Sequence, residues 1–409
     1  MNITLVNPFD PPPGDEIRPG RYAAFAAALA DAGHAVTWLS SDFSHTLKRS
    51  RDIQKIPAAC KAAGIDIDLA PTAPYHSNVC LARLRSHRQL ARAVAHKIAA
   101  AQTPPDVVVA SAPPPNVAAA AIDAAHARGA RAILDVQDLW PETFARVLPA
   151  PLRWLGKLAL RPMATAMRHA ESAADAGIAV AEGYRQHYAA RAKPGATSHV
   201  LHLGADLAEF DSAAASDLPG VPDAAKGARW ILCGGMVGTA LHWQFLLDLA
   251  DQLADADVHI LVAGTGPAET YLRDQIAARK LGNVHLLGFQ PYPAFCALAA
   301  RADFGLNHYR ADSFVYFPNR VFDYFAADLP VINTVGGELA DLLAARDAGF
   351  TTTSFDAEAT AGYVKRMLAA RPPTDDRPAP SARRGDWVAA FDRPAIARRL
   401  VEIVEEEQI

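Results

Sequence analysis

Cysteine is scarce in this sequence, and the few cysteines are not paired. The 409-residue chain has four, Cys60, Cys80, Cys233 and Cys296, and none belongs to a CxxC motif. Disulfide frameworks and structural zinc sites need cysteines at close, regular spacings. The pattern therefore argues against both and fits a reducing compartment.

Long apolar runs are also missing. No run reaches the roughly 20 apolar residues that cross a bilayer. The opening residues MNITLV lack the basic region that precedes the apolar core of a secretory signal. We therefore expect a cytoplasmic protein.

Two common nucleotide motifs are absent. The sequence has no GxxxxGK followed by Ser or Thr, which argues against a P-loop NTPase. No GxGxxG follows the first strand-like run, which weakens a dehydrogenase interpretation. Two Asp-x-Asp pairs, at 66–68 and 255–257, have a spacing that can hold a divalent metal. The first lies in a strand-like run and the second in the turn before a strand, where a ligand is not expected, so we predict no metal site. We also expect no nucleic-acid partner.

The net charge of −4 hides an asymmetry between the two halves. Residues 1–200 carry 22 Lys and Arg against 16 Asp and Glu, a net +6, whereas residues 201–409 carry 18 against 28, a net −10. A basic first half indicates an anionic partner surface there. The alternative is an uneven scatter of solvated charges.

Short apolar runs alternate with helical patterns through both halves. Strand patterns fall at 3–6, 35–39, 107–110, 133–136, 178–180, 230–233, 258–262, 284–287, 304–307 and 331–333. Helical patterns fall at 20–32, 79–101, 117–128, 152–174, 241–253, 268–280, 294–300, 319–327 and 394–407. This alternation predicts parallel sheets that are covered by helices on both faces.

We predict an α/β fold with two doubly wound Rossmann-like domains facing across a cleft. The predicted boundaries are 1–204 for the N-terminal domain, 205–229 for a polar linker, 230–371 for the C-terminal domain, and 372–409 for a proline-rich segment with a closing helix. Ligands of open parallel sheets bind outside the carboxyl ends of the strands. Functional residues should therefore follow the strands in both halves.

The loop after the first strand, NPFDPPPGDEIRPGRY, is long and opens a helix near Gly20. Helix N-termini favour anions, and Arg18 and Arg21 add positive charge. This pattern indicates a loop that binds phosphate or the acceptor, with Gly20 and Arg21 at its end. The alternative is an ordinary surface loop.

After the strand at 133–136 comes QDLWPE, in which Asp138 and Glu142 flank Trp140. A carboxylate here could orient an acceptor hydroxyl or act as a base, and Trp140 could offer an apolar face to a sugar or lipid. The alternative is a helix N-terminus with Asp138 as its cap. We take Asp138 as the acceptor-side catalytic candidate.

Glycines follow two strands of the second half. Gly234, Gly235 and Met236 follow one strand, and Gly264 and Gly266 follow the next. Glycine lets backbone N–H groups approach a phosphate closely. Two such turns in successive crossovers of one sheet indicate a phosphate-binding edge.

The stretch FPNRVFDYFAADLPVIN, residues 317–333, places Arg320 and Asp323 on an otherwise apolar helix just before a core strand. It resembles the donor-site helix of GT-B glycosyltransferases of family 4. AAALADAGHAVTWLS, DVQDLWPE, HLGADLAEF, VAGTGP and NVHLLGF match the same family in the same order, from residue 1 to about 350. The resemblance is closest to bacterial members that build surface polysaccharide and O-antigen.

The resemblance implies roles for several residues. Asp323 would accept hydrogen bonds from the nucleotide ribose, and Arg320 would neutralise the donor diphosphate as charge develops on the leaving group. Asn319 would belong to the same site, backbone amides near Gly235 and Gly264 would hold the diphosphate, and Phe289 would frame the base. The alternative for the helix is an internal Arg320–Asp323 pair.

The sequence departs from the family pattern at three positions. Asp323 replaces a glutamate, Val315 stands where another glutamate often touches the donor sugar, and His242 stands near the place of a missing lysine. We expect a sugar transferase with a UDP- or GDP-linked donor, a glycan or lipid-linked acceptor, retention of configuration, and no cofactor or essential metal. The alternatives are a nucleotide-sugar 2-epimerase and a non-catalytic nucleotide-sugar-binding subunit.

Two helical segments of the basic half have an amphipathic pattern. Residues 79–101 include Arg83, Arg85, His87 and Arg88, and residues 152–169 include Trp154 among leucines and further basic residues. Such helices can lie on anionic lipid. We therefore expect peripheral contact with the inner membrane; the alternative is two solvated helix faces.

Overall fold

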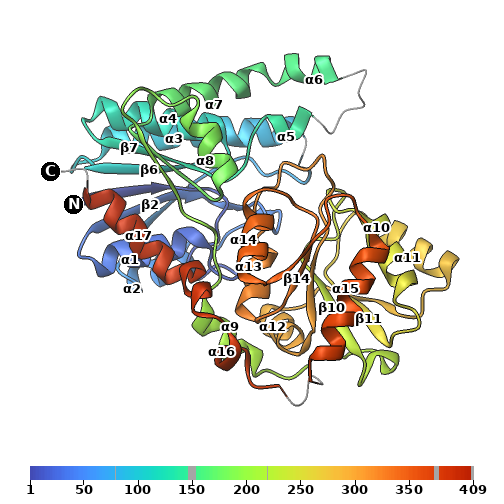
Figure 1. Ribbon diagram of the computed structural model, residues 1–409. Helices are drawn as coiled ribbons and strands as arrows, with labels where there is room; N and C mark the ends of the chain where they lie inside the picture. Colours follow the sequence, from blue (N-terminus) through green and yellow to red (C-terminus); the bar gives the residue numbers. More distant parts are fainter. Residues whose placement is uncertain (79, 146–152, 219, 373–376, 407–409) are drawn as a thin grey trace. The chain divides into compact units, whose positions relative to one another are not determined.

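The computed structural model describes residues 1–78, 80–145, 153–218, 220–372 and 377–406 (Figure 1). The chain forms two compact units, which we describe separately. Unit 1 consists of residues 1–202 together with 393–409, and unit 2 consists of residues 203–392. In the described part of the chain, every helix is too short or too polar to cross a membrane.

Unit 1 is built on a seven-stranded parallel sheet in the order β5-β2-β1-β6-β7-β8-β9. Its strands are β1 (Asn2–Val6), β2 (Ala35–Ser41), β5 (Ile65–Ala70), β6 (Val107–Ala112), β7 (Arg131–Val136), β8 (Ala176–Ala179) and β9 (Thr197–Val200). A small antiparallel hairpin, β3 (Phe43–Ser44) and β4 (Arg49–Ser50), follows β2. The strand order reverses between β1 and β6, which is where a doubly wound sheet opens a crevice.

Helices cover both faces of this sheet (Figure 1). One layer contains α3 (Leu81–Ala100), α4 (Pro115–Ala127), α5 (Glu142–Ala145), α6 (Arg153–Ala159) and α7 (Arg161–Ala173). The other contains α1 (Arg21–Asp31), α2 (Lys55–Ala62) and the C-terminal α17 (Arg393–Glu405), and α8 (Glu182–Ala189) precedes β9. Because α1 and α17 pack together against β1 and β2, the last helix of the chain completes the core of the first unit.

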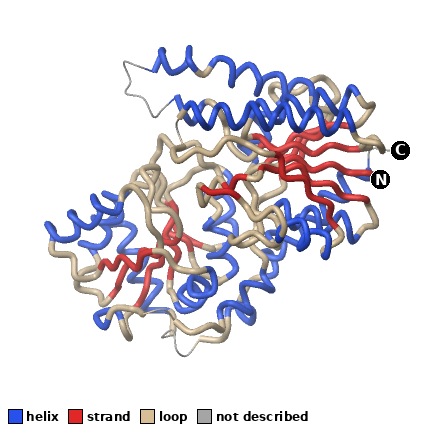
Figure 2. The backbone as a smooth tube through the Cα atoms, turned by 180° about the vertical axis from the view of Figure 1, so that it is seen from behind, coloured by secondary structure: helices blue, strands red, loops and turns tan. Residues whose placement is uncertain are grey.

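Unit 2 contains a six-stranded parallel sheet in the order β12-β11-β10-β13-β14-β15. The strands of both sheets are drawn in red in Figure 2. Its strands are β10 (Arg229–Gly234), β11 (Val258–Ala263), β12 (Val284–Gly288), β13 (Phe304–Asn307), β14 (Val331–Asn333) and β15 (Gly349–Thr351). The order reverses between β10 and β13. Fully buried side chains on these two strands, such as Ile231 and Phe304, form the centre of its core.

The helices of unit 2 also form two layers (Figure 1). One contains α10 (Trp243–Gln252), α11 (Glu269–Arg279) and α15 (Ala357–Ala370), and the other contains α12 (Tyr292–Arg301), α13 (Arg320–Ala326) and α14 (Glu338–Arg346). The shorter elements are α9 (Leu207–Ala214), α16 (Pro380–Arg383), and two 3-10 helices, η2 (Asp223–Ala225) and η4 (Asp386–Phe391).

Every strand that the sequence pattern predicted is present, and so is the doubly wound arrangement of each sheet. The differences lie in short or polar elements. The predicted helix at 152–174 is two helices, α6 and α7, and Pro162 stands in the first turn of α7, where its missing N–H costs no helical hydrogen bond. Residue 152 lies outside the described residues. The predicted linker contains α9, whose N-terminus is capped by Asp206 accepting from the Glu209 N–H at 2.9 Å.

Candidate functional site

The carboxyl edge of the unit 2 sheet brings together most of the donor-site residues predicted for this unit. β10 ends at Gly234 and is followed by Gly235 and Met236, while its neighbour β13 ends at Asn307 and is followed by His308. This is the point where the strand order reverses. Ligands of open α/β sheets bind at such a switch point.

Tyr324 fixes α13 at this edge. Its buried hydroxyl accepts from the Gly234 N–H at 2.9 Å and donates to the Leu306 carbonyl at 3.3 Å, so it joins α13 to β10 and β13. The ring fits only because residue 305 is glycine, where a Cβ would lie 2.3 Å from the ring carbons. The placement of Arg320 and Asp323 therefore follows from the packing of a neighbouring aromatic side chain.

The guanidinium of Arg320 faces the turn after β10. Its Nη2 lies 3.6 Å from the position that a Cβ would occupy at Gly235, and its Nη1 contacts the Cys233 Sγ at 3.8 Å. The group also stands 5.3 Å from the centre of the Tyr309 ring. Within the described residues, Arg320 forms no ion pair with a carboxylate, so the internal Arg320–Asp323 pair is not formed. This leaves a cation available for an anionic ligand.

Asp323 lies one helical turn after Arg320 and is half-buried. Its Oδ1 accepts from the Tyr292 hydroxyl at 3.0 Å. Asn319 precedes α13 as an exposed residue, and its side chain does not cap the helix. The three donor-site residues predicted on this segment are thus close together, with Asp323 the most firmly held.

The backbone N–H groups at the end of β10 differ in whether they already donate a hydrogen bond within the protein. The Gly234 N–H donates to Tyr324, and the Gly235 N–H donates to the Ala263 carbonyl at 3.0 Å. Among the described residues, the Met236 N–H has no hydrogen-bond acceptor, and the Met236 side chain is 67% exposed. Met236 is therefore the better candidate for a backbone donor to a ligand.

Gly264 and Gly266 allow the turns after β10 and β11 to touch. A Cβ at Gly264 would lie 1.8 Å from the Gly235 carbonyl oxygen, and one at Gly266 would lie 2.5 Å from the Val237 carbonyl oxygen. The Val237 N–H also donates to the Thr265 carbonyl at 3.0 Å. Glycine is required here by the contact between two loops, whatever the loops bind.

Phe289 directly follows β12 at the same edge of the sheet and is 75% exposed. A large aromatic side chain that is mostly in water at the carboxyl end of a parallel strand is available to stack on a planar ligand. Its position fits the predicted role of framing a base.

His308 was not predicted as a site residue, yet it approaches the same Cys233 Sγ that Arg320 contacts. His308 is fully buried, its Nδ1 is 3.9 Å from the Cys233 Sγ, and its Nε2 has no hydrogen-bond partner among the described residues. Burial lowers its pKa well below the usual value, and Arg320 and His242 lower it further. His308 is therefore neutral and does not compete with Arg320 for an anion. A histidine directly after a buried strand was the available signal.

A cavity of about 300 Å³ lies at the carboxyl ends of β13, β14 and β15. Val315, one of the three departures from the family pattern, lines this cavity. His242, another departure, caps α10 by accepting from the Phe245 N–H at 3.1 Å and stacks on Phe355. The other lining residues are Arg310, Ala311, Ser313, Tyr316, Thr334, Val335, Gly336 and Thr353.

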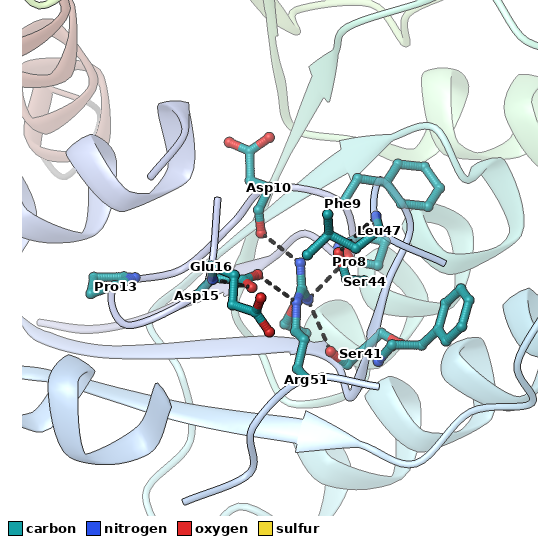
Figure 3. Close-up of polar contacts among 12 residues, drawn as sticks. Pro8, Phe9, Asp10, Pro13, Asp15, Glu16, Ser41, Ser44, Leu47 and Arg51 are labelled. Carbon is teal, nitrogen blue, oxygen red and sulfur yellow. Dashed lines mark hydrogen bonds and ion pairs between the residues drawn. The ribbon is translucent and has the colours of Figure 1, made fainter. Parts of the chain in front are cut away.

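In unit 1, the long loop after β1 is held from within by Arg51 (Figure 3). The buried guanidinium donates to Asp15 at 3.0 Å, to the carbonyls of Pro8 and Asp10 at 3.3 and 3.1 Å, and to the carbonyl of Ser41 at 2.9 Å. These contacts fix the loop to β2 and to its own backbone.

Asp10 already occupies the N-terminus of α1, where the sequence predicted a phosphate. Its Oδ2 accepts from the Tyr22 N–H at 2.8 Å and also contacts Gly20. Burial raises the pKa of Asp10, although the Tyr22 hydrogen bond and the nearby Arg21 act in the opposite direction. Gly20 thus makes room for a protein carboxylate, which opposes a phosphate at this helix end.

Arg21, predicted on the acceptor side, is buried. It donates to the carbonyl of His202 at 2.7 Å and to that of Leu201, and pairs with Asp135 at 3.2 Å. Its contacts join α1 to β7 and to the end of β9. The arrangement favours a structural role for Arg21.

In the QDLWPE segment the Asp138 carboxylate is held by its own neighbours, but it stands four residues before the start of α5 and so is not in the predicted N-cap position. Asp138 accepts from the Leu139 N–H at 2.8 Å, from the Trp140 Nε1 at 3.0 Å and from the Thr143 hydroxyl at 3.1 Å. Burial raises the pKa of Asp138. Trp140 is buried, and Glu142 begins α5 with an Oε2 that has no hydrogen-bond partner among the described residues.

The two amphipathic segments differ from the expected pattern at Arg83 and His87. Both side chains are buried, so they cannot face a membrane. Arg85, Arg88 and Arg92 lie on the exposed side of α3. Leu81 is 82% exposed on the same helix, and Trp154 of α6 is 64% exposed. Val79 lies outside the described residues.

A family model and several solved structures are similar to this chain. Residues 228–370 match a family model described as "Glycosyl transferases group 1", which covers the predicted donor domain. HepE of Anabaena, solved in complex with UDP, is 14% identical, and the match covers 99% of this chain and 100% of that one with a TM-score of 0.66. No curated protein matches the sequence.

Two further solved structures have the same fold. WaaG, described as a glycosyltransferase involved in lipopolysaccharide biosynthesis, is 14% identical to this chain. The match covers 98% of this chain and 99% of WaaG, with a TM-score of 0.62. A sucrose-phosphate synthase from Thermosynechococcus elongatus is 14% identical to this chain. The match covers 99% of this chain and 98% of the synthase, with a TM-score of 0.69. The fold is that of the GT-B glycosyltransferases, which confirms the fold that the sequence resemblance implied.

Proposed function

We propose that this protein is a glycosyltransferase that moves a sugar from a nucleotide-diphosphate donor to a glycan or lipid-linked acceptor, in the synthesis of a bacterial surface polysaccharide. The observation that carries the proposal is Arg320. Its guanidinium has no carboxylate partner among the described residues and faces the turn after β10. A diphosphate leaving group needs such a cation, because negative charge accumulates on it as the glycosidic bond breaks.

The rest of the unit 2 edge supports a nucleotide-sugar. Asp323 can accept from ribose hydroxyls, Phe289 can stack on a base, and the Met236 N–H can donate to a phosphate. The cavity of about 300 Å³ at the carboxyl ends of β13, β14 and β15 is large enough for a sugar. HepE, a structural neighbour, was solved with UDP and with UDP-glucose, so we propose a UDP-linked donor first and a GDP-linked one second. By resemblance, we also propose retention of configuration and no essential metal.

Donor binding and turnover distinguish this function from its alternatives. The purified protein is titrated with UDP and with GDP, and then incubated with the matching donor sugars, with and without a lipid-linked acceptor preparation. We expect nucleotide binding and acceptor-dependent release of the nucleotide diphosphate. Conversion of the donor alone to an epimer would identify a 2-epimerase. Donor binding with no turnover under any acceptor condition would identify a binding subunit.

Asp323→Asn should weaken nucleotide binding with little change in melting temperature. The amide keeps the size of the side chain and can still accept from Tyr292, but it loses the charge that strengthens acceptance from two ribose hydroxyls. Calorimetric titration with UDP and thermal melts of the ligand-free protein measure the two effects, with Tyr292→Phe as the control for the internal bond. A large fall in melting temperature with unchanged affinity would make Asp323 structural.

We also propose that a basic face of unit 1 contacts an anionic membrane, where a lipid-linked acceptor would lie. This basic face consists of the exposed residues Leu81, Arg85, Arg88, Arg92, Trp154, Leu158, Arg161 and Arg168 on α3, α6 and α7. Apolar side chains beside arginines suit the boundary of an anionic bilayer. Each basic residue near such a surface contributes about 1 kcal/mol, so five arginines can hold the protein there reversibly.

Flotation with phosphatidylglycerol vesicles tests the basic face. We expect binding that weakens with salt and with the triple change of Arg85, Arg88 and Arg92 to glutamine. A matched variant removes the same charge from unit 2, at the exposed Arg273, Arg346 and Arg366, and should bind like the unchanged protein. Equal flotation of both variants would show that this face does not bind lipid.

A further inference from the structure

A second cluster of cations stands at the carboxyl edge of the unit 1 sheet, and the proposed function makes no use of it. Its residues follow β1, β2, β5 and β7 or begin α3. We call it the Arg83 cluster. It consists of Phe9, His45, Lys48, Tyr75, Asn78, Arg83, His87 and Trp140.

Arg83 is the centre of this cluster and is only 5% exposed. Its Cζ lies 4.6 Å from the centre of the Trp140 ring and 5.8 Å from that of Tyr75, and its Nη1 donates to the Asn78 carbonyl at 2.7 Å. Aromatic faces stabilise a cation but leave its charge uncompensated. Among the described residues, Arg83 forms no ion pair with a carboxylate.

The other buried arginines of unit 1 differ in this respect. Arg21 pairs with Asp135 at 3.2 Å, and Arg51 pairs with Asp15 at 3.0 Å. Removing a cation from water without an anion is costly, and folded proteins ordinarily compensate it as these two pairs do. Arg83 thus differs from these two in having no carboxylate partner among the described residues, and an anion supplied by a ligand would compensate its charge.

Lys48 brings a second cation to the same place. It lies in the turn between β3 and β4, where its Nζ is 5.0 Å from the centre of the Tyr75 ring and donates to the Asn78 Oδ1 at 2.6 Å. Within the described residues it also has no carboxylate partner. Arg83 and Lys48 thus approach one phenol ring, and Lys48 and Asn78 reach solvent while Arg83 does not.

The histidines of the cluster do not change this balance of charge. The pKa of His45 and that of His87 are each lowered to about 3, first by burial and then by the charge of Arg83. Both are neutral near pH 7. His45 is held by the Tyr75 hydroxyl at 2.7 Å, and His87 lies 3.4 Å from the Arg83 Nε.

The space within the cluster limits what can bind. The cavity beside Phe9, Tyr75 and His87 measures about 10 Å³, which holds one water molecule and no sugar ring. An anionic group must therefore approach from the side of Lys48 and Asn78. It would be a small group at the end of a larger molecule.

We propose that Lys48 and Arg83 form a binding site for one oxyanion group, a phosphate or a carboxylate, carried by the acceptor. A guanidinium and an ammonium beside one aromatic ring are suited to either group. The inference rests on the proposed function only in assigning the anion to the acceptor. Binding of the anion itself can be measured without any donor or turnover.

Calorimetric titrations of the full chain with inorganic pyrophosphate and with glucuronate test the site, with neutral glucose as a blank. All proteins in this experiment carry Arg320→Ala, which removes the cation of the proposed donor site. We expect one equivalent of at least one anion to bind, and Lys48→Met to weaken that binding at least tenfold. The matched control Lys61→Met removes an exposed lysine of α2, outside both the Arg83 cluster and the basic face, and should change the affinity less than twofold.

The two anions distinguish the sources of the group. Binding of pyrophosphate alone indicates a phosphorylated acceptor, and binding of glucuronate alone indicates an acidic glycan. Arg83→Met is tested beside Lys48→Met, and thermal melts establish that each variant is folded. The site is overturned if neither anion binds to the Arg320→Ala protein, or if Lys48→Met and Lys61→Met bind alike. Either result leaves the transferase proposal standing, because no donor is present.

Discussion

Arg320→Ala should reduce sugar transfer about 10- to 150-fold while the protein stays folded. The change removes a charge-assisted hydrogen bond to the diphosphate, which contributes about 1.5–3 kcal/mol. No internal ion pair is lost, since no carboxylate of the described residues pairs with this guanidinium. Initial rates at saturating and limiting donor, together with a thermal melt, measure the effect.

A surface arginine of the same unit provides the control. Arg273 is exposed on α11 and pairs with Glu269 at 2.9 Å, so Arg273→Ala removes the same charge at a distance from the carboxyl edge. Such exposed pairs contribute little, and its rates should match those of the unchanged protein. Unchanged kinetics in a folded Arg320→Ala protein would remove Arg320 from the donor site.

Gly264→Ala should impair both stability and nucleotide binding. A Cβ at this position would lie 1.8 Å from the Gly235 carbonyl oxygen, and neither backbone can move without shifting the turn after β10. Overpacking of this kind costs about 1–3 kcal/mol. We therefore expect a lower free energy of unfolding and a weaker affinity for UDP, because the displaced turn carries the Met236 N–H.

Gly282→Ala is the matched control for this substitution. Gly282 lies in the turn before β12, where an added Cβ would meet nothing within 4 Å. Urea unfolding and UDP titration of the two variants separate a local clash from a general effect of replacing glycine. If Gly264→Ala behaves like Gly282→Ala in both measurements, the contact between the two turns does not position the site.

The fold could be predicted because its buried strands are continuous apolar runs. β6 and β11 are buried along their whole length, and such runs bounded by glycine or proline have few other interpretations. Two of the edge strands gave no such signal. β9 is TSHV and β15 is GFT, and both lie at sheet edges where polar residues are tolerated.

The site could be predicted only in part. Arg320 and Asp323 were found because charged residues on an apolar helix need a reason, and the family motif supplied one. Arg21 and Trp140 look equally functional in the sequence, but their burial depends on contacts with Asp135 and Arg83, which are distant in the chain. Sequence spacing does not show whether a charge faces the interior or the solvent. For the same reason, Arg83 was read as part of a surface helix.

The most direct test of the account is a crystal structure of the protein with UDP. We predict that the diphosphate lies within hydrogen-bond distance of the Arg320 guanidinium and the Met236 N–H, with the ribose at Asp323 and the base at Phe289. UDP bound elsewhere, with Arg320 more than a hydrogen bond away from every phosphate oxygen, would contradict the assignment of the carboxyl edge of β10 as the donor site.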